Sequence, residues 1–184
     1  SVVDNCLCSP ALQKPLHHGV DLVLHSATKF IDGQGRVMAG AIIGKKNLIE
    51  KIKNVTRTSG PALAPFNAWV LYKSLETLSI RMNAQSKSAK QIAEWLEKHP
   101  KISRVFYPEL KTNCQFEIAM RQQSKGGAIV SFELFDLFPE TKNLTAWKVI
   151  DKTKIFSKSG NLGDTRSIIT HPSSTTHSRI SKYF

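Results

Sequence analysis

The feature that most limits the fold is a long stretch from Pro65 to Pro100 that contains neither glycine nor another proline. Proline suits the first turn of a helix, and an apolar stripe follows it at helical spacing. That stripe consists of Trp69, Val70, Leu75, Leu78 and Met82. We predict two helices or one bent helix here, with Trp69, Arg81 and Met82 packing it between two domains. The predicted domains are residues 1–78 and residues 79–184, the second being cut before its end.

Short apolar segments on both sides of this stretch predict strands that alternate with helices. In the first domain we expect strands at 2–3, 21–25 and 39–43 and a helix at 47–55. In the second domain we expect strands at 104–107, 128–134 and 155–156 and helices at 116–123 and 145–150. This alternation predicts an α/β fold for the first domain and an α+β fold for the second.

The chain is strongly basic, with 26 Lys and Arg against 14 Asp and Glu and a formal net charge of +12. An excess of this size raises the question of nucleic-acid binding. The basic residues are spread through helical segments rather than gathered in one arm, and few aromatic residues lie among them to stack on bases. We therefore predict a solvated basic surface without a nucleic-acid partner. A basic nucleic-acid-binding module is the alternative from another class.

The sequence contains no pattern that predicts a membrane or a secreted protein. No stretch approaches the roughly 18 uninterrupted apolar residues that span a membrane, and no basic-then-apolar leader is present. The three cysteines, Cys6, Cys8 and Cys114, include no CxxC pair. They predict free thiols in a reducing compartment, with neither a disulfide framework nor a metal site. We expect a cytoplasmic protein that has no membrane partner.

The candidate chemistry lies at the ends of two predicted strands. Asp4 and Lys29 both stand at or just past the carboxyl end of an apolar strand, where open α/β sheets bind ligands. A site for pyridoxal 5'-phosphate (PLP) needs an amine, an acid beside the pyridine nitrogen and donors for the phosphate. Lys29 and Asp4 can supply the first two, and the hydroxyls of Ser26 and Thr28 the third. On spacing alone, a surface lysine and a turn-forming aspartate stay open as alternatives.

A series of short segments, in order and at compatible spacing, carries a resemblance over nearly the whole chain. The segments are 3–5 (VDN), 9–15 (SPALQKP), 25–29 (HSATK), 65–69 (PFNAW), 75–78 (LETL), 81–82 (RM), 126–128 (GGA), 131–133 (SFE), 162–164 (LGD) and 171–177 (HPSSTTH). Together they resemble the Cys/Met-metabolism family of PLP-dependent enzymes. That family contains cystathionine γ-synthases, cystathionine lyases, methionine γ-lyases and homoserine-ester sulfhydrylases.

This resemblance implies a role for each candidate residue. Lys29 becomes the lysine that holds PLP as a Schiff base and then shuttles protons between substrate carbons. Asp4 becomes the partner of the pyridine nitrogen, and Ser26 and Thr28 become phosphate ligands. The resemblance also implies the aminotransferase-like fold (fold type I), with part of the large PLP domain and most of the smaller C-terminal domain. A homotetramer is implied by the family only.

Two segments narrow the resemblance within the family. Residues 32–36 (DGQGR) and 161–165 (NLGDT) resemble the O-succinylhomoserine sulfhydrylases. This resemblance implies γ-replacement, in which sulfide displaces succinate from O-succinylhomoserine and gives homocysteine for methionine biosynthesis. Asn161 would then lie near the substrate carboxylate, with a loop turn as the alternative reading. A cystathionine γ-synthase, or a cystathionine or methionine lyase of the same family, is the alternative activity.

The two ends of the chain predict that it is incomplete. Ser1 leads directly into a strand, and the chain stops after a loop-like run. By resemblance, the aromatic residue that stacks on PLP, the glycine-led phosphate loop and the Tyr and Arg lent by a neighbouring subunit lie upstream. The arginine that grips the substrate α-carboxylate lies downstream. We expect the isolated chain to be a poor catalyst or none, and a truncated non-catalytic subunit is a further alternative.

Overall fold

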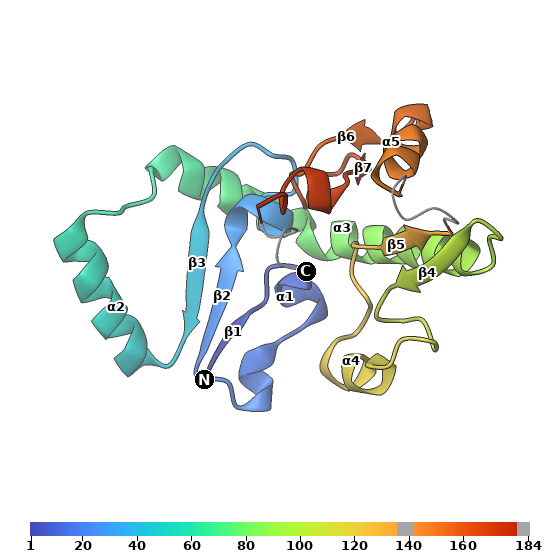
Figure 1. The fold of residues 1–184 in the computed structure, drawn as a ribbon. Helices are drawn as coiled ribbons and strands as arrows, with labels where there is room; N and C mark the ends of the chain where they lie inside the picture. The colour runs from blue at the N-terminus through green and yellow to red at the C-terminus, as the bar shows by residue number, and fades with distance from the viewer. Residues whose placement is uncertain (136–141, 180–184) are drawn as a thin grey trace.

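A three-stranded sheet forms the first part of the computed structural model, which describes residues 1–135 and 142–179. Its strands are β1 (Val2–Asp4), β2 (Leu22–Ser26) and β3 (Gly40–Gly44), in the order β1-β2-β3. β1 and β2 run parallel, whereas β2 and β3 run antiparallel. A short helix α1 (Ser9–Leu12) and a 3-10 turn (Pro15–His18) connect β1 to β2. Because parallel strands end at the same edge of a sheet, β1 and β2 deliver their carboxyl ends side by side (Figure 1).

Two helices follow β3. Helix α2 (Lys46–Ser59) ends at Gly60, whose positive φ of 82° makes it a left-handed C-cap. Helix α3 (Pro65–Glu97) begins with proline in its first turn and continues as one element of 33 residues. The sequence had left two helices or one bent helix open at this place. The structure has a single helix, because no residue after Pro65 interrupts the backbone hydrogen bonds.

Helix α3 joins the sheet to the rest of the molecule (Figure 1). One face of the helix buries Val70, Ser74, Leu78, Met82, Ser86, Ala89, Ala93 and Leu96. Leu78 and Met82 form one core cluster with Leu12 and Phe30, next to the sheet. Ala89 and Ala93 form a second cluster with Tyr107 and Leu110. Trp69 is 58% exposed, so the prediction that it packs the helix between domains is wrong.

The second part of the chain contains two small strand pairs. β4 (Ile102–Phe106) pairs antiparallel with β5 (Ser131–Leu134), and β6 (Ser157–Lys158) pairs parallel with β7 (Ile168–Ile169). Helices α4 (Phe116–Gln122) and α5 (Lys142–Lys152) and a 3-10 turn (Pro172–Ser174) complete it. Strand β6 begins after Ile155 and Phe156, so the strand predicted at 155–156 is wrong. Helix α3 crosses the boundary predicted between residues 78 and 79 without a break, and the division into two domains stays a prediction.

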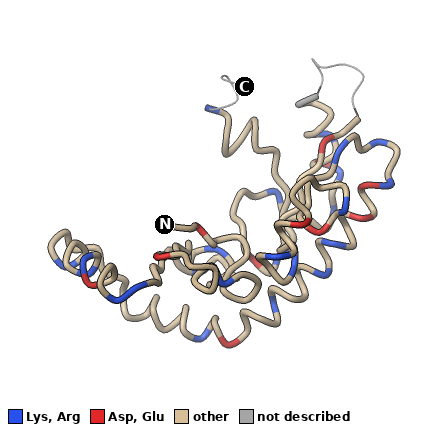
Figure 2. The backbone as a smooth tube through the Cα atoms, turned by 90° about the horizontal axis from the view of Figure 1, so that it is seen from below, with Lys and Arg blue, Asp and Glu red and all other residues tan. Residues whose placement is uncertain are grey.

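Charged residues are dispersed over the fold. Figure 2 shows Lys and Arg along α2, α3 and the second part of the chain, with Asp and Glu between them. Several lysines form ion pairs, such as Lys45 with Asp21 and Lys90 with Glu109. Among the described residues, no helix combines the length and the apolar character that crossing a membrane requires.

Candidate active site

The backbone around Lys29 departs from regular structure. Strand β2 ends at Ser26, and the chain continues into a π-helical turn, η2 (Ala27–Ile31). Within this turn Lys29 itself has a non-helical conformation, with φ −90° and ψ −121°. Such departures persist only where the surroundings hold them, and they cluster at functional sites. The conformation of Lys29 must therefore be held by the residues that surround it.

Gly163 lies directly against the backbone of Lys29. A Cβ atom at Gly163 would lie 2.4 Å from the Lys29 carbonyl carbon and 2.6 Å from the Phe30 nitrogen. Gly163 also has a φ of +99°, which other residues adopt only at a cost. Glycine is thus required there twice, for its backbone conformation and for the close approach. This contact brings the connection between β6 and β7 onto the turn that carries the lysine.

The same connection supplies a partner for the Lys29 amine. Nζ of Lys29 donates a hydrogen bond to Oδ1 of Asn161 at 3.2 Å, across 132 residues of sequence. Both residues line an open hollow of about 320 Å³. The other lining residues are Thr28, Gly35, Arg36, Val37 and Met38. The structure therefore joins Lys29 to the residue that the resemblance placed near the substrate carboxylate, and it leaves space beside the amine.

Asp4 stands at the end of β1, where it pairs with Leu24 of β2. The Cys6 backbone N–H donates to Oδ1 of Asp4 at 2.9 Å. Hydrogen bonds from the Cys6 thiol and backbone, together with the nearby His25, hold the pKa of Asp4 below its usual value. Asp4 is therefore ionised at neutral pH. An ionised carboxylate is the form that keeps a pyridine nitrogen protonated.

Cys6 connects the two strand ends. Its sulfur accepts a hydrogen bond from the Ser26 backbone N–H at 2.7 Å, and its own backbone N–H donates to Asp4. Burial raises the pKa of the Cys6 thiol, and the hydrogen bond to Asp4 raises it further. The thiol therefore keeps its proton and can donate it to the carboxylate. The sequence predicted a free thiol here, which is confirmed, but gave no sign of this bridging position.

The two hydroxyls expected to bind phosphate differ in their contacts. Among the described residues, the Ser26 hydroxyl has no hydrogen-bond partner and is free to donate. The Thr28 hydroxyl accepts from the Ala39 N–H at 2.9 Å and donates to the Ala39 carbonyl at 3.2 Å. That carbonyl also receives the Thr28 backbone N–H at 3.1 Å. The Thr28 hydroxyl can therefore turn to an anion without leaving the Ala39 carbonyl unpaired.

Comparison with known proteins shows the family of the chain. Residues 1–183 match the family model described as Cys/Met metabolism PLP-dependent enzyme. The chain belongs to this family. An O-succinylhomoserine sulfhydrylase of Pseudomonas aeruginosa is 51% identical over 179 residues, which cover 97% of this chain and 43% of that protein. An L-methionine gamma-lyase of Fusobacterium nucleatum is 42% identical over 183 residues, covering 98% and 45%.

A solved structure of the same kind confirms the predicted fold. The crystal structure of cystathionine gamma-lyase from Lactobacillus plantarum, complexed with L-serine, superposes with a TM-score of 0.91 at 35% identity. It covers all of this chain, and this chain covers 47% of it. The aminotransferase-like fold (fold type I), the family and PLP as its cofactor are thus confirmed. The chain spans less than half the length of the relatives it matches.

The described residues fit the cofactor of this family. Lys29 offers an amine beside a hollow that Thr28 also lines, Asp4 offers an ionised carboxylate, and Ser26 carries a second hydroxyl at the end of β2. Asp4 lies close to the lysine segment, since Cys6 makes hydrogen bonds to both Asp4 and Ser26. The Lys29 charge is also near enough to act on the pKa of the Cys6 thiol. The individual roles of these residues stay predictions. Sequence reasoning missed Cys6 as a bridge and Gly163 as a contact, although Gly163 lay within a segment of the resemblance.

Proposed function

We propose that this chain forms the lysine-bearing part of a PLP-dependent enzyme that catalyses γ-replacement on O-succinylhomoserine. In this reaction sulfide adds at the γ-carbon, succinate leaves, and homocysteine forms. The observation that carries the proposal is the hydrogen bond from Lys29 to Asn161 beside the open hollow. Support for this substrate is the 51% identity to a relative named O-succinylhomoserine sulfhydrylase.

Lys29 is proposed as the catalytic residue. Bound PLP supplies an electron-withdrawing ring that stabilises negative charge on substrate carbons. Nζ of Lys29 would hold the cofactor covalently until the amine of the substrate takes its place. The freed amine would then accept a proton from one substrate carbon and return it to another, as a general base and acid. The departures of Lys29 from regular backbone geometry aim the amine at the hollow where this exchange would occur.

Asp4, Ser26 and Thr28 are proposed to hold the cofactor from its two ends. The ionised Asp4 would keep a proton on the pyridine nitrogen, since its own pKa lies below the usual value. The hydroxyls of Ser26 and Thr28 would donate to the phosphate. Cys6 would fix the position of Asp4 relative to Ser26 through its two hydrogen bonds. These roles suit the side-by-side ends of β1 and β2.

Asn161 is proposed to serve the substrate. Its Oδ1 accepts from Lys29, which leaves the Nδ2 donors of the same amide for the substrate α-carboxylate. The residue is confined from the other side, because a Cβ atom at Gly35 would lie 3.3 Å from Nδ2. Asn161 would thus orient both the free amine and the substrate. The resemblance also implies a homotetramer, and this stays a prediction.

The test begins with the native protein. Borohydride reduction of the protein with bound PLP, followed by peptide mass analysis, is expected to label Lys29. Lys29→Ala should abolish the visible absorption band of the Schiff base. The reduced sample is then compared with untreated protein in an assay of O-succinylhomoserine and sulfide. A label on another lysine, or a band that survives Lys29→Ala, would refute the assignment of Lys29.

A lyase activity is the second candidate, because the L-methionine gamma-lyase of Fusobacterium nucleatum is 42% identical over the same span. A lyase would use water to split methionine or cystathionine into a thiol, an oxoacid and ammonia, with no thiol added. A sulfhydrylase would need sulfide and an activated homoserine. Measuring kcat/KM for both substrates on one preparation decides between them, since the preferred substrate should exceed the other by at least about tenfold, or about 1.4 kcal/mol.

A further inference from the structure

The turn after Lys29 leaves backbone carbonyl groups that need donors. The Asp32 N–H bonds to the Ala27 carbonyl at 3.0 Å, and the Gly33 N–H bonds to the Lys29 carbonyl at 2.9 Å. The chain then turns away into the loop that precedes β3. The carbonyls of Phe30 and Ile31 are those that a terminating helix leaves without a following turn to pair with. Their partner comes from another element.

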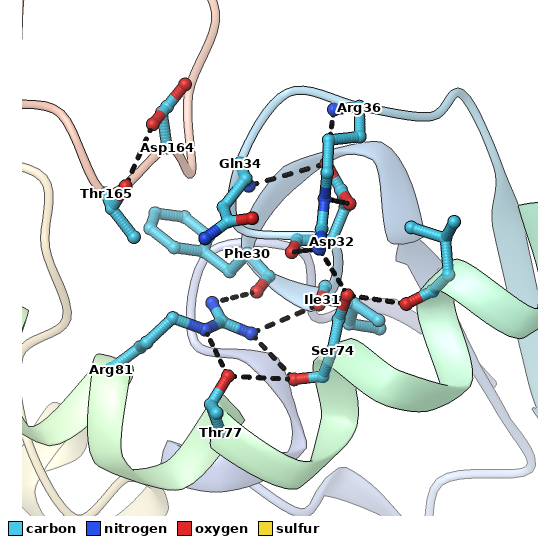
Figure 3. A network of polar contacts seen from close by, with 11 residues as sticks. Phe30, Ile31, Asp32, Gln34, Arg36, Ser74, Thr77, Arg81, Asp164 and Thr165 are labelled. Atoms are coloured by element: carbon cyan, nitrogen blue, oxygen red, sulfur yellow. Dashed lines mark hydrogen bonds and ion pairs between the residues drawn. The ribbon is translucent and has the colours of Figure 1, made fainter.

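Arg81 of helix α3 supplies the donors (Figure 3). Its Nη1 donates to the Phe30 carbonyl at 2.7 Å, and its Nη2 donates to the Ile31 carbonyl at 3.2 Å. The guanidinium is held on its own helix as well, by Nη2 to the Ser74 carbonyl at 3.1 Å and Nε to the Thr77 hydroxyl at 3.0 Å. The planar fork of arginine matches these converging oxygens, which a lysine ammonium cannot do from one position.

The turn also closes tightly over the guanidinium. A Cβ atom at Gly33 would lie 2.1 Å from Nη1 of Arg81, and Gly33 has a φ of +73°. Gly33 therefore allows the backbone to pass directly against the arginine. With Gly163 against Lys29 on another side, the lysine backbone is confined from two elements that lie far apart in sequence.

A buried carboxylate and a second arginine complete the network (Figure 3). Asp32 is 1% exposed and accepts from the Arg36 backbone N–H at 2.7 Å and from Arg36 Nε at 3.0 Å. Nη2 of Arg36 reaches the Asp32 carbonyl at 3.0 Å and the Ser74 hydroxyl at 2.5 Å. Burial lowers the pKa of Arg81; the Asp32 charge opposes this effect and the Arg36 charge adds to it. The turn is thus tied to α3 at two points, Arg81 and Ser74.

We infer that Arg81 is a positioning residue for Lys29, which fixes the lysine backbone so that Nζ points at Asn161 and the hollow. Arg81 bonds to the two residues that follow Lys29 and lies against the turn that Gly33 makes. It would act through the backbone and touch neither substrate nor cofactor. The inference rests on the proposed function, because it concerns the orientation of the catalytic amine.

The experiment compares Arg81→Lys and Arg81→Met with the control Arg121→Lys in the native protein. Arg121 is an exposed residue of α4. A displacement of about 1 Å in a reacting group can lower the rate about a hundredfold. We therefore expect both Arg81 variants to bind PLP and to lower kcat by about tenfold to a hundredfold, with KM changed less than about twofold. In both Arg81 variants, the pH at which the visible absorption band of bound PLP is half converted should differ from that of the wild type. Arg121→Lys should match the wild type in kcat, in KM and in this pH.

The remaining outcomes also decide whether Arg81 positions Lys29. If Arg81→Met does not fold, Arg81→Lys is judged by the same two readouts, per folded protomer that has bound PLP. A kcat and a pH midpoint like those of the wild type in Arg81→Lys and any folded Arg81→Met would overturn the inference. So would a loss of kcat that follows the unfolded fraction alone. A wild type without a label on Lys29 would overturn the proposed function, and the inference with it, whereas a labelled wild type tests the inference alone.

Discussion

Cys6 is the residue whose role is least visible in the sequence. Its backbone N–H bonds to Asp4, its sulfur accepts from Ser26, and its thiol helps to lower the pKa of Asp4. We expect Cys6→Ala to weaken PLP binding about fivefold, since one hydrogen bond to a charged group is worth about 1 kcal/mol or more. Cys6→Ser should lose less, because a hydroxyl keeps both a donor and an acceptor. Titration with PLP measures the dissociation constants, and the exposed Cys114 provides the control Cys114→Ala. Equal affinities in Cys6→Ala and Cys114→Ala would contradict the bridge.

His25 makes the fold sensitive to acid. The residue is 5% exposed, and burial lowers the pKa of the imidazole. Within the part of the chain that the structure describes, its Nδ1 has no hydrogen-bond partner. The unfolded chain therefore takes up a proton at His25 before the folded protein does. Stability from this residue is complete above the unfolded pKa of about 6.5 and is lost as the pH falls below it.

His25→Gln is the variant that isolates this effect, because an amide does not titrate in this range. Urea unfolding at a series of pH values is expected to show a free energy of unfolding that falls between about pH 6.5 and pH 5 in the wild type. The slope should be smaller in His25→Gln. Identical slopes in the two proteins would mean that His25 has the same pKa in the folded and unfolded states, which would contradict the prediction.

At the scale of single residues, the sequence could indicate the chemistry but not all of its supports. Lys29 and Asp4 stand out because each follows an apolar strand, and strand ends are where ligands bind. Cys6 gave no sign of its bridging position, and Arg81 was expected only to pack α3 between domains, since a short-range pattern carries no information about a contact across β1 and β2 or across 50 residues of chain. Trp69 shows the opposite error, where an apolar residue at helical spacing is exposed.

Among the elements, α3 carries residues of both core clusters. Met82 is completely buried on its inner face, in the cluster with Leu12, Phe30 and Leu78. We expect Met82→Ala to lower the free energy of unfolding by about 2–5 kcal/mol, because it removes apolar contacts and leaves a cavity. Ile80, which is 71% exposed on the same helix, gives the control Ile80→Ala, with a change within about 0.5 kcal/mol. Chemical denaturation of both variants would show whether the two faces of α3 differ in this way.

The bounds of the helices and strands show how much secondary structure the sequence periodicity could predict. The strands β1, β2 and β3 and the helices α2 and α4 lie within a few residues of where periodicity placed them. The strand predicted at 155–156 is displaced to Ser157–Lys158, because a two-residue strand is fixed by its partner β7 and not by its own composition. Helix α3 could not be assigned as one element or two, since periodicity gives the helical state but not its continuity.

On the scale of the whole molecule, the candidate site is assembled from three distant parts. The ends of β1 and β2 meet because the strands are parallel, and this much follows from the sequence. Asn161, in the connection between β6 and β7, lies 132 residues from Lys29 along the chain, and only the resemblance placed it near the substrate carboxylate. No periodic pattern could do so, because the contact depends on how the second part of the chain packs. Gln85 of α3 helps to hold this connection, by a hydrogen bond to the Asp164 carbonyl at 3.2 Å.

The contact between Gly163 and Lys29 gives the sharpest test of this assembly. Gly163→Ala would place a methyl group 2.4 Å from the Lys29 backbone, and either the lysine turn or the β6–β7 connection must move. Gly19 provides a matched control, because its φ of +83° is similar but no atom of the described residues lies within 4 Å of an added Cβ. Gly19→Ala should cost only the backbone strain of about 1–2 kcal/mol.

Gly163→Ala is expected to cost more than this control and also to reduce the borohydride label on Lys29, because the amine no longer points into the hollow. Denaturation measures the first effect, and peptide mass analysis measures the second. If the two variants lose the same stability and Lys29 is labelled equally in both, the connection does not press on the lysine. A reduced label in Gly163→Ala alone would show that the second part of the chain sets the position of the catalytic amine.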